Sequence, residues 1–132
     1  MGKVALLLDT HIFLWWIFDD SRLPGGIRGM IECVDNTILV SSASVWEITT
    51  KFRLGKLPEA SIVARNVALW IEKAGFQSIS VHPCHAQLAG EWEMPHRDPF
   101  DRMLAAQAKQ EQIPLATVDR ALCDFPIQIV KD

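Results

Sequence analysis

The order of elements along this chain predicts an α/β fold, a three-layer α/β/α sandwich around a central, mostly parallel sheet. Short apolar runs alternate with amphipathic segments of helical length over the 132 residues, which is the pattern of repeated βαβ units. The first run, Val4 to Leu8, is continuously apolar, as expected of a strand buried on both faces of a parallel sheet. The length, with no linker or internal repeat, predicts one domain over residues 1–132.

Five segments have the composition of buried strands. Each is short and mostly aliphatic or β-branched, and turn-forming or capping residues lie between them. Asp35-Asn36, for example, forms a turn before the second strand, because both side chains favour turns. In chain order the predicted strands are residues 4–8, 37–40, 76–81, 114–117 and 127–130.

The segments between the strands have helical periodicity and recognisable ends. Thr10 is placed to cap the first helix, and Asp19-Asp20-Ser21 ends it. Gly55 and Gly75 each follow a helix, as glycine often does at a helix C-terminus. Asp98-Pro99 combines a capping residue with proline at the first helical position. The predicted helices are residues 10–17, 27–33, 41–54, 58–74, 83–92 and 99–112, with a turn of helix after residue 119.

Composition excludes several classes of protein. The formal net charge is −3, so any nucleic acid would meet a local basic patch rather than a basic protein surface. Three cysteines without regular spacing argue against a disulfide framework and indicate a reducing compartment. The N-terminus has one lysine before a short apolar run, which is not a signal peptide. No apolar stretch approaches the roughly 20 residues of a membrane span. These features predict a cytoplasmic protein without membrane association.

Four acidic residues stand beside the apolar runs: Asp9, Glu47, Asp101 and Asp119. Each has an ordinary structural explanation. Asp9 and Asp119 follow strands and precede helical turns, where a carboxylate commonly acts as a cap. Glu47 has capping-box spacing from Ser44. Asp101 stands in the first turn of a helix, where the helix dipole favours an acid by about 0.3–1 kcal/mol.

Taken together, the four acids predict a metal site. Loops after parallel strands share the carboxyl edge of the sheet, so these side chains are expected to converge there. Converging carboxylates repel one another, and their pKa values rise unless a cation lies between them. Oxygen ligands without neighbouring Cys or His suit Mg²⁺ or Mn²⁺ better than zinc. Because such ions keep positions open for water and phosphate oxygens, the pattern predicts metal-assisted phosphodiester hydrolysis.

Four motifs resemble those of PIN-domain ribonucleases, most closely the VapC toxins of bacterial toxin–antitoxin pairs. They are Leu6-Leu7-Leu8-Asp9-Thr10-His11, Ser44-Val45-Trp46-Glu47-Ile48, His96-Arg97-Asp98-Pro99-Phe100-Asp101-Arg102 and Ala116-Thr117-Val118-Asp119. The resemblance runs over essentially the whole chain, and the segment from His96 to Ala108 is the most specific. It implies a PIN-like α/β/α fold and an Mg²⁺- or Mn²⁺-dependent endoribonuclease that cleaves RNA. It also implies a homodimer held inactive by a cognate antitoxin, with Asp9, Glu47, Asp101 and Asp119 as the catalytic, metal-binding acids.

The roles within this hypothesis differ from acid to acid. Asp9 and Asp101 are expected to be the main ligands of one ion, and Asp119 to complete the site directly or through water. Glu47 is expected to orient a water molecule or to help hold a second ion. Asp98 stays ambiguous, as a helix cap or as a group that supports the ligands from behind.

Two other interpretations of function stay open. One is a non-catalytic PIN-like RNA-binding or scaffold domain, against which the four filled acidic positions argue. The other is a metal-dependent phosphohydrolase that acts on DNA or on a small phosphate ester. Nucleotide-binding forms of this second alternative are weakened because the chain has no glycine-rich phosphate loop.

Basic residues near the acids suggest further contacts. Lys51 lies four residues after Glu47 on the same helix face, so it either restrains that carboxylate or meets RNA phosphate; a surface ion pair is the alternative. Arg102 is expected to contact substrate or an acidic group of a partner. His96 and His11 stand next to acidic motifs, but neither is assigned a catalytic role.

Two adjacent tryptophans, Trp15 and Trp16, indicate an interaction surface. Successive residues of a helix are about 100° apart, so both rings cannot face the core. Exposed apolar patches often mark protein interfaces. The helix from Ile12 to Ile17 is therefore expected to contact an antitoxin or a second copy of the chain.

Overall fold

A computed structural model describes residues 3–132 of the chain. Met1 and Gly2, which the sequence analysis included in the domain and in the N-terminal segment, lie outside the described residues. At the centre is a five-stranded sheet in the order β3-β2-β1-β4-β5, in which every pairing is parallel. The strands are β1 (Ala5–Leu8), β2 (Thr37–Ser41), β3 (Gln77–Ile79), β4 (Leu115–Ala116) and β5 (Ile129–Val130). All five predicted strands are thus present.

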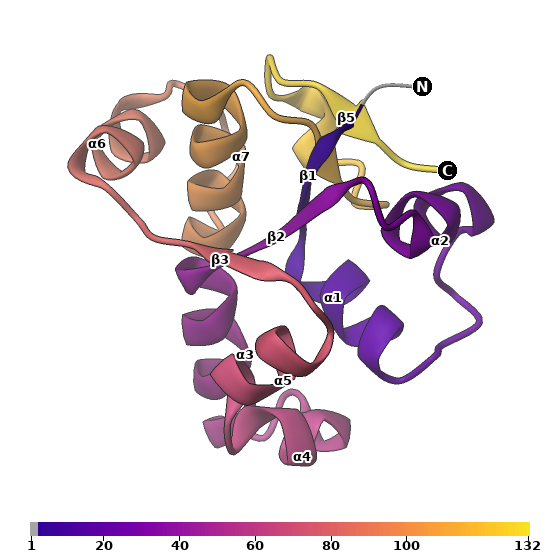
Figure 1. The fold of residues 1–132 in the computed structure, drawn as a ribbon. Helices are drawn as coiled ribbons and strands as arrows, with labels where there is room; N and C mark the ends of the chain where they lie inside the picture. The colour runs from indigo at the N-terminus through magenta and orange to yellow at the C-terminus, as the bar shows by residue number, and fades with distance from the viewer. Residues whose placement is uncertain (1–2) are drawn as a thin grey trace.

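Helices connect successive strands and cover the sheet (Figure 1). In the part of the chain that the structure describes, none of them is long and apolar enough to cross a membrane. Their bounds are α1 (Thr10–Ile17), α2 (Gly25–Glu32), α3 (Ser42–Arg53), η1 (Pro58–Ala60), α4 (Ser61–Ala64), α5 (Val67–Lys73), α6 (Pro83–Glu91), α7 (Pro99–Glu111) and η2 (Leu122–Asp124), where η marks a 3₁₀ helix.

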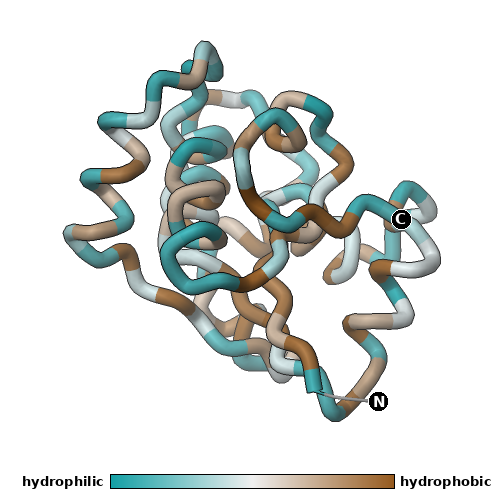
Figure 2. The backbone as a smooth tube through the Cα atoms, turned by 90° about the horizontal axis from the view of Figure 1, so that it is seen from above, coloured by the Kyte–Doolittle hydropathy of each residue, from teal (hydrophilic) through white to brown (hydrophobic). Residues whose placement is uncertain are grey.

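The side chains of β1 separate two hydrophobic cores. Leu6 and Leu8 join a core formed with α1, α2, α4 and α5, whereas Leu7 packs with Leu104 of α7 and Leu115 of β4 in a second core. All three β1 leucines are fully buried, because alternate side chains point to opposite faces and both faces are covered. In the tube of Figure 2, brown segments run through the interior and teal segments lie mostly at the periphery. The predicted three-layer α/β/α sandwich is confirmed.

The single helix predicted over residues 58–74 is wrong. The segment forms η1, α4 and α5 in succession. Asn66 causes the last break, because its side chain accepts a hydrogen bond from the Leu69 backbone N–H at 3.2 Å and so caps α5. Asparagine competes with helix backbone by such local hydrogen bonds. The apolar pattern survives the break, since Val63 and Val67 both face the core.

Two other predictions about element ends need correction. β3, β4 and β5 are two or three residues long, shorter than predicted, because the apolar runs extend past the residues that find a strand partner. The cap of α1 is Asp9, not Thr10: Asp9 Oδ1 accepts a hydrogen bond from the Ile12 backbone N–H at 2.8 Å. Thr10 is instead the first residue of the helix.

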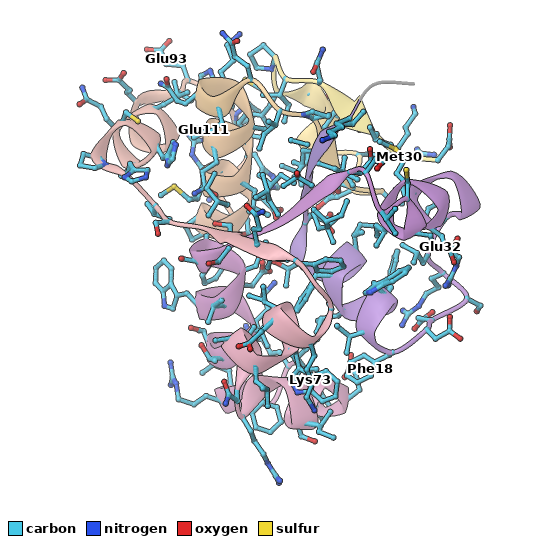
Figure 3. All side chains as sticks on the ribbon, viewed as in Figure 1. Phe18, Met30, Glu32, Lys73, Glu93 and Glu111 are labelled. Carbon is cyan, nitrogen blue, oxygen red and sulfur yellow. The ribbon has the colours of Figure 1, made fainter. Side chains whose placement is uncertain are left out.

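Polar contacts fasten α6 to α7. His85 of α6 is fully buried, and its Nδ1 accepts a hydrogen bond from the His82 backbone N–H at 3.0 Å. That leaves Nε2 to donate to the Glu111 carboxylate, 2.9 Å away. Glu111 is labelled on α7 in Figure 3, close to α6. These contacts fix the two helices that flank the connection through residues 92–98.

Arg102 holds that connection itself. Its guanidinium donates hydrogen bonds to four backbone carbonyls, those of Ala89 (2.8 Å), Met94 (2.9 Å), His96 (2.8 Å) and Trp92. The expectation that Arg102 contacts substrate or a partner's acid is therefore wrong, because four of its N–H groups are used within the chain. The planar guanidinium suits this role, since its donors are fixed relative to one another.

We predict that Arg102→Lys destabilises the protein by roughly 2–4 kcal/mol, because a lysine ammonium cannot reach all four carbonyls and leaves some of them without a donor. The free energy of unfolding in urea, measured by circular dichroism, checks this. Arg97→Lys is the matched control: Arg97 is exposed on the same connection, and its replacement should change stability by less than about 0.5 kcal/mol. Equal stability of the two variants would contradict the assigned role of Arg102.

Candidate active site at the carboxyl edge of the sheet

The parallel topology brings the four predicted acids to one edge of the sheet. Asp9 directly follows β1, and its backbone N–H donates to the Ala116 carbonyl of β4 at 3.0 Å, so the exits of these two strands adjoin. Asp119 lies three residues beyond β4. Glu47 belongs to α3, which begins directly after β2, and Asp101 stands in the first turn of α7. Figure 1 shows α7 standing end to end with α3, and Trp46 of α3 packs on Phe100 of α7.

Asp9 is a buried carboxylate with few partners. Only 5% of the residue is exposed. Burial raises the pKa of Asp9 above its ordinary value, and hydrogen bonds from Thr117 and from the Ile12 backbone N–H oppose this only in part. The nearby charge of Glu47 raises the pKa of Asp9 further. A cation beside this group would therefore be favoured.

Glu47 is more deeply buried, at 3% exposure, and both of its oxygens have donors. Oε1 lies 2.5 Å from Thr10 Oγ1, which is 2.9 Å from Ser44 Oγ. Oε2 forms an ion pair with the Lys51 ammonium, which confirms that Lys51 restrains Glu47. The capping-box alternative for Glu47 is wrong, because α3 is capped by Ser41, whose Oγ accepts a hydrogen bond from the Ala43 backbone N–H at 2.9 Å.

Asp101 accepts a hydrogen bond from His96, whose Nε2 lies 2.8 Å from its Oδ2. Burial, followed by the negative charges of Asp98, Glu47 and Asp119, raises the pKa of Asp101 to about 6, although the His96 contact lowers it. His96 is thus a site residue to which the sequence analysis gave no role. Its position five residues before Asp101, in the same motif, was the signal available in the sequence.

The two remaining aspartates are held by backbone N–H groups. Asp119 is exposed, and its Oδ1 accepts a hydrogen bond from the Ala121 N–H at 2.9 Å. Asp98 Oδ1 accepts from the N–H groups of Phe100 (2.8 Å) and Asp101 (3.1 Å). The interpretation of Asp98 as a helix cap is therefore confirmed, and its charge also acts on Asp101.

These acids share one electrostatic environment, but they do not yet enclose an ion. The pKa of Asp101 responds to Glu47 and Asp119, and that of Asp9 responds to Glu47. Among residues 3–132, however, no three Asp, Glu, His or Cys side chains form a group that could hold a metal ion as they stand. Each of the four carboxylates is turned to a donor of the chain itself. The candidate metal ligands are all carboxylate oxygens with like charges, and such a set of ligands suits a hard cation such as Mg²⁺. Binding one requires some carboxylates to exchange an internal donor for the ion.

We predict that Asp101→Asn stabilises the metal-free protein at pH 8 and has no such effect near pH 4. The pKa of Asp101 rises from 3.8 to about 6 on folding, so stability that is fully present below pH 4 is lost as the pH rises through 6. Two pKa units correspond to at most about 3 kcal/mol. Asparagine carries no charge and still accepts the His96 hydrogen bond, so it avoids this loss.

The measurement is the melting temperature at both pH values in EDTA. Glu72→Gln, which removes a charge from an exposed position of α5, controls for net charge. If Asp101→Asn has the same melting temperature as the wild type at pH 8, ionisation of Asp101 does not destabilise the folded protein.

Comparison with known proteins agrees with this architecture. Residues 6–127 match the family described as PIN domain. A stretch of 66 residues is 38% identical to Ribonuclease VapC16 from Mycobacterium tuberculosis, over 48% of this chain and 47% of that protein. The chain thus matches about half the length of this curated relative.

Solved structures extend the likeness over nearly the whole chain. VapBC2 from Rickettsia felis, bound to a promoter DNA fragment, gives a TM-score of 0.70 at 18% identity, over 96% of this chain and 98% of that one. VapBC-1 from nontypeable Haemophilus influenzae gives 0.67 at 17% identity, over 97% and 98%. At such identities the likeness shows the fold alone. Since the family match covers residues 6–127 and the sheet, helices and acids have the arrangement described above, this chain belongs to the PIN-domain family.

Proposed function

We propose that this protein is a Mg²⁺-dependent endoribonuclease, with Mn²⁺ as the alternative ion, and that it acts as the toxin of a toxin–antitoxin pair. The observation that carries the proposal is the gathering of Asp9, Glu47, Asp101 and Asp119 at one sheet edge of a PIN domain, where burial and neighbouring carboxylates raise the pKa values of Asp9 and Asp101. The partial match to a protein named a ribonuclease supports RNA as the substrate.

The four acids are assigned different roles because their surroundings differ. When bound, Mg²⁺ would lower the pKa of the attacking water and neutralise charge on the scissile phosphate. Asp9 and Asp101 would hold the ion, because their carboxylates gain most from a neighbouring cation. Asp119, exposed at the rim, would complete the site directly or through water. Glu47, held by Thr10 and Lys51, would orient the attacking water or help to hold a second ion.

RNA binding needs positive charge near these acids, because phosphate contacts supply most of the affinity. Arg97 and Arg120 are both exposed and adjoin the acidic motifs. In-line attack by water would leave a 5′-phosphate and a 3′-hydroxyl, as the family resemblance implies.

We predict that Asp9→Asn and Asp101→Asn each lower the rate of RNA cleavage at least about 100-fold, because losing one ligand removes several kcal/mol of transition-state stabilisation. EDTA should abolish wild-type cleavage, and added Mg²⁺ should restore it. The measurement is cleavage of defined RNAs, with the end groups of the products mapped. Asp35→Asn, in an exposed turn, is the control and should cleave like the wild type. Cleavage that survives in both site variants would remove these acids from the mechanism.

The same assay separates the alternative functions. A non-catalytic RNA-binding or scaffold domain would retain RNA without cutting it at any Mg²⁺ concentration. A phosphohydrolase of another specificity would act on DNA or on a small phosphate ester in parallel reactions. The four acids argue for catalysis, and the ribonuclease relative favours RNA over the other substrates.

A cognate antitoxin is the first partner that we propose, supported by the likeness to VapBC structures. The α1 tryptophans expected to contact it are both half-buried. Trp16 packs near Phe76, with ring centroids 6.2 Å apart, and the Arg22 guanidinium lies 5.1 Å from the Trp15 ring centroid. A contact at α1 therefore stays a prediction. Other exposed apolar side chains follow the ends of α1 and α3 or lie on α4 and α5: Phe18, Leu54, Ile62 and Leu69.

A second copy of the chain is the other partner that we propose, and we assign it to the face around Trp46. Trp46 is 60% exposed, and its ring stands edge-on to Phe100 at 4.7 Å between centroids. Beside it opens a cavity of about 410 Å³, lined mainly by apolar groups that include Ala43, Ala89 and Met103. A protrusion and a hollow on one face are what a two-fold symmetric interface requires, because each copy fills the hollow of the other.

We predict that Trp46→Ala makes the protein monomeric at micromolar concentration, because the protruding ring is lost from both halves of the interface. Sedimentation velocity checks this. Ile62→Ala is the matched control: Ile62 is 55% exposed but lies on α4 and does not line this cavity. A Trp46→Ala variant that sediments as the wild type, or a wild type that is itself monomeric, would contradict the assignment.

Two wider expectations stay predictions. One is that residues 1–132 act as one domain, and the other is that the protein is cytoplasmic. Cys33, Cys84 and Cys123 are free thiols at the surface, as expected of a protein kept in a reducing compartment.

A further inference from the structure

Lys51 directs its ammonium into the carboxylate edge rather than into solvent. It follows Glu47 by one turn of α3 and forms an ion pair with Glu47 Oε2. The Lys51 side chain is 29% exposed and the Glu47 side chain 4%, so this is not an ordinary surface pair. Glu47 would be left as a buried carboxylate if the ammonium were absent, and an unpaired buried charge is costly.

The charges around Lys51 come from two helices and the loop before the second. Burial lowers the pKa of Lys51, but the hydrogen bond and charge of Glu47, together with the charges of Asp98 and Asp101, outweigh it and raise the pKa. The ammonium is therefore charged near neutral pH, where it pairs with Glu47 and is influenced by the charges of Asp98 and Asp101. Two of these acids, Glu47 and Asp101, are among those that a metal ion would need.

We propose that Lys51 is the built-in counter-cation of the carboxylate edge, a positioning residue that neutralises the acids when no metal ion is bound and competes with the ion for them. The inference rests on the proposed metal-dependent function. It follows from the ion pair of Lys51 with Glu47, and from the burial of Glu47, whose side chain is 4% exposed. The ammonium holds Glu47 by one oxygen while Thr10 holds the other.

The first consequence concerns stability without metal. In EDTA, Lys51→Gln should lower the melting temperature by roughly 5 °C or more, because Glu47 loses its partner. Arg53→Gln is the matched control, since it removes a positive charge from the same last turn of α3 but from an exposed side chain. The double variant Glu47→Gln/Lys51→Gln should recover much of the loss, because no unpaired charge remains.

The second consequence concerns Mg²⁺ itself. In a melting-temperature titration with MgCl₂, the midpoint for Lys51→Gln should fall roughly three- to tenfold below that of the wild type, because a competing positive charge is gone. Lys51→Arg keeps the charge and should stay close to the wild type. Arg53→Gln should shift the midpoint much less, because its side chain is exposed and screened.

The outcomes separate this inference from the proposed function. If Lys51→Gln behaves like Arg53→Gln in EDTA, or if its Mg²⁺ midpoint rises, Lys51 is not a counter-cation and the inference is overturned. If Lys51→Gln does not fold, a stable double variant supports the inference, and an unfolded one overturns it. If Mg²⁺ does not stabilise even the wild type, the proposed metal dependence fails, while the comparison in EDTA still decides the role of Lys51.

Discussion

Burial of carboxylates at one edge of a parallel sheet, to which their mutual repulsion adds, is the constraint that shapes the rest of this site. A parallel sheet delivers every strand exit to the same edge, so acids that are far apart in the chain become neighbours. Each acid is stabilised by a separate hydrogen-bond donor. A backbone N–H donates to Asp9, the Thr10 hydroxyl and the Lys51 ammonium contact Glu47, and the His96 imidazole contacts Asp101. The compensation is incomplete, because the pKa values of Asp9 and Asp101 stay raised. A dication would lower the remaining free-energy cost of ionising these two carboxylates.

The scaffold around the edge is built to keep these groups in place. β1 lies in the middle of the sheet with both faces covered, so Asp9 starts from the most constrained strand. Asp101 lies instead in the first turn of α7, which follows the irregular connection through residues 92–98. Arg102 donates hydrogen bonds to four backbone carbonyls in and next to that connection. The contact between His85 and Glu111 joins α6 to α7, the helices on either side of it. A mobile entry to α7 would let Asp101 withdraw from its neighbours, so polar contacts remote from the chemistry bear directly on it.

Much of the architecture could be read from local patterns. Continuous apolar runs indicated buried parallel strands, and a strand was found in each of the five predicted segments, with parallel pairing throughout the sheet. Local patterns gave the wrong prediction where a side chain could either continue a helix or cap one. Asn66 stood inside a segment of helical periodicity but capped a new helix, and Asp9 rather than Thr10 capped α1. Strand lengths were also overestimated, because an apolar run does not reveal where its hydrogen-bonding neighbour ends.

For the site, the sequence by itself determined the type of chemistry: which acids are present, that they follow strands, and that oxygen ligands without cysteine suit a hard dication. Only the tertiary structure decided what each of these groups touches. It turned Arg102 inward, brought His96 onto Asp101, and paired Lys51 with Glu47. The physical reason is that residue type and spacing are encoded locally, whereas the choice of partner for a long polar side chain depends on which backbone and side-chain groups folding brings within reach.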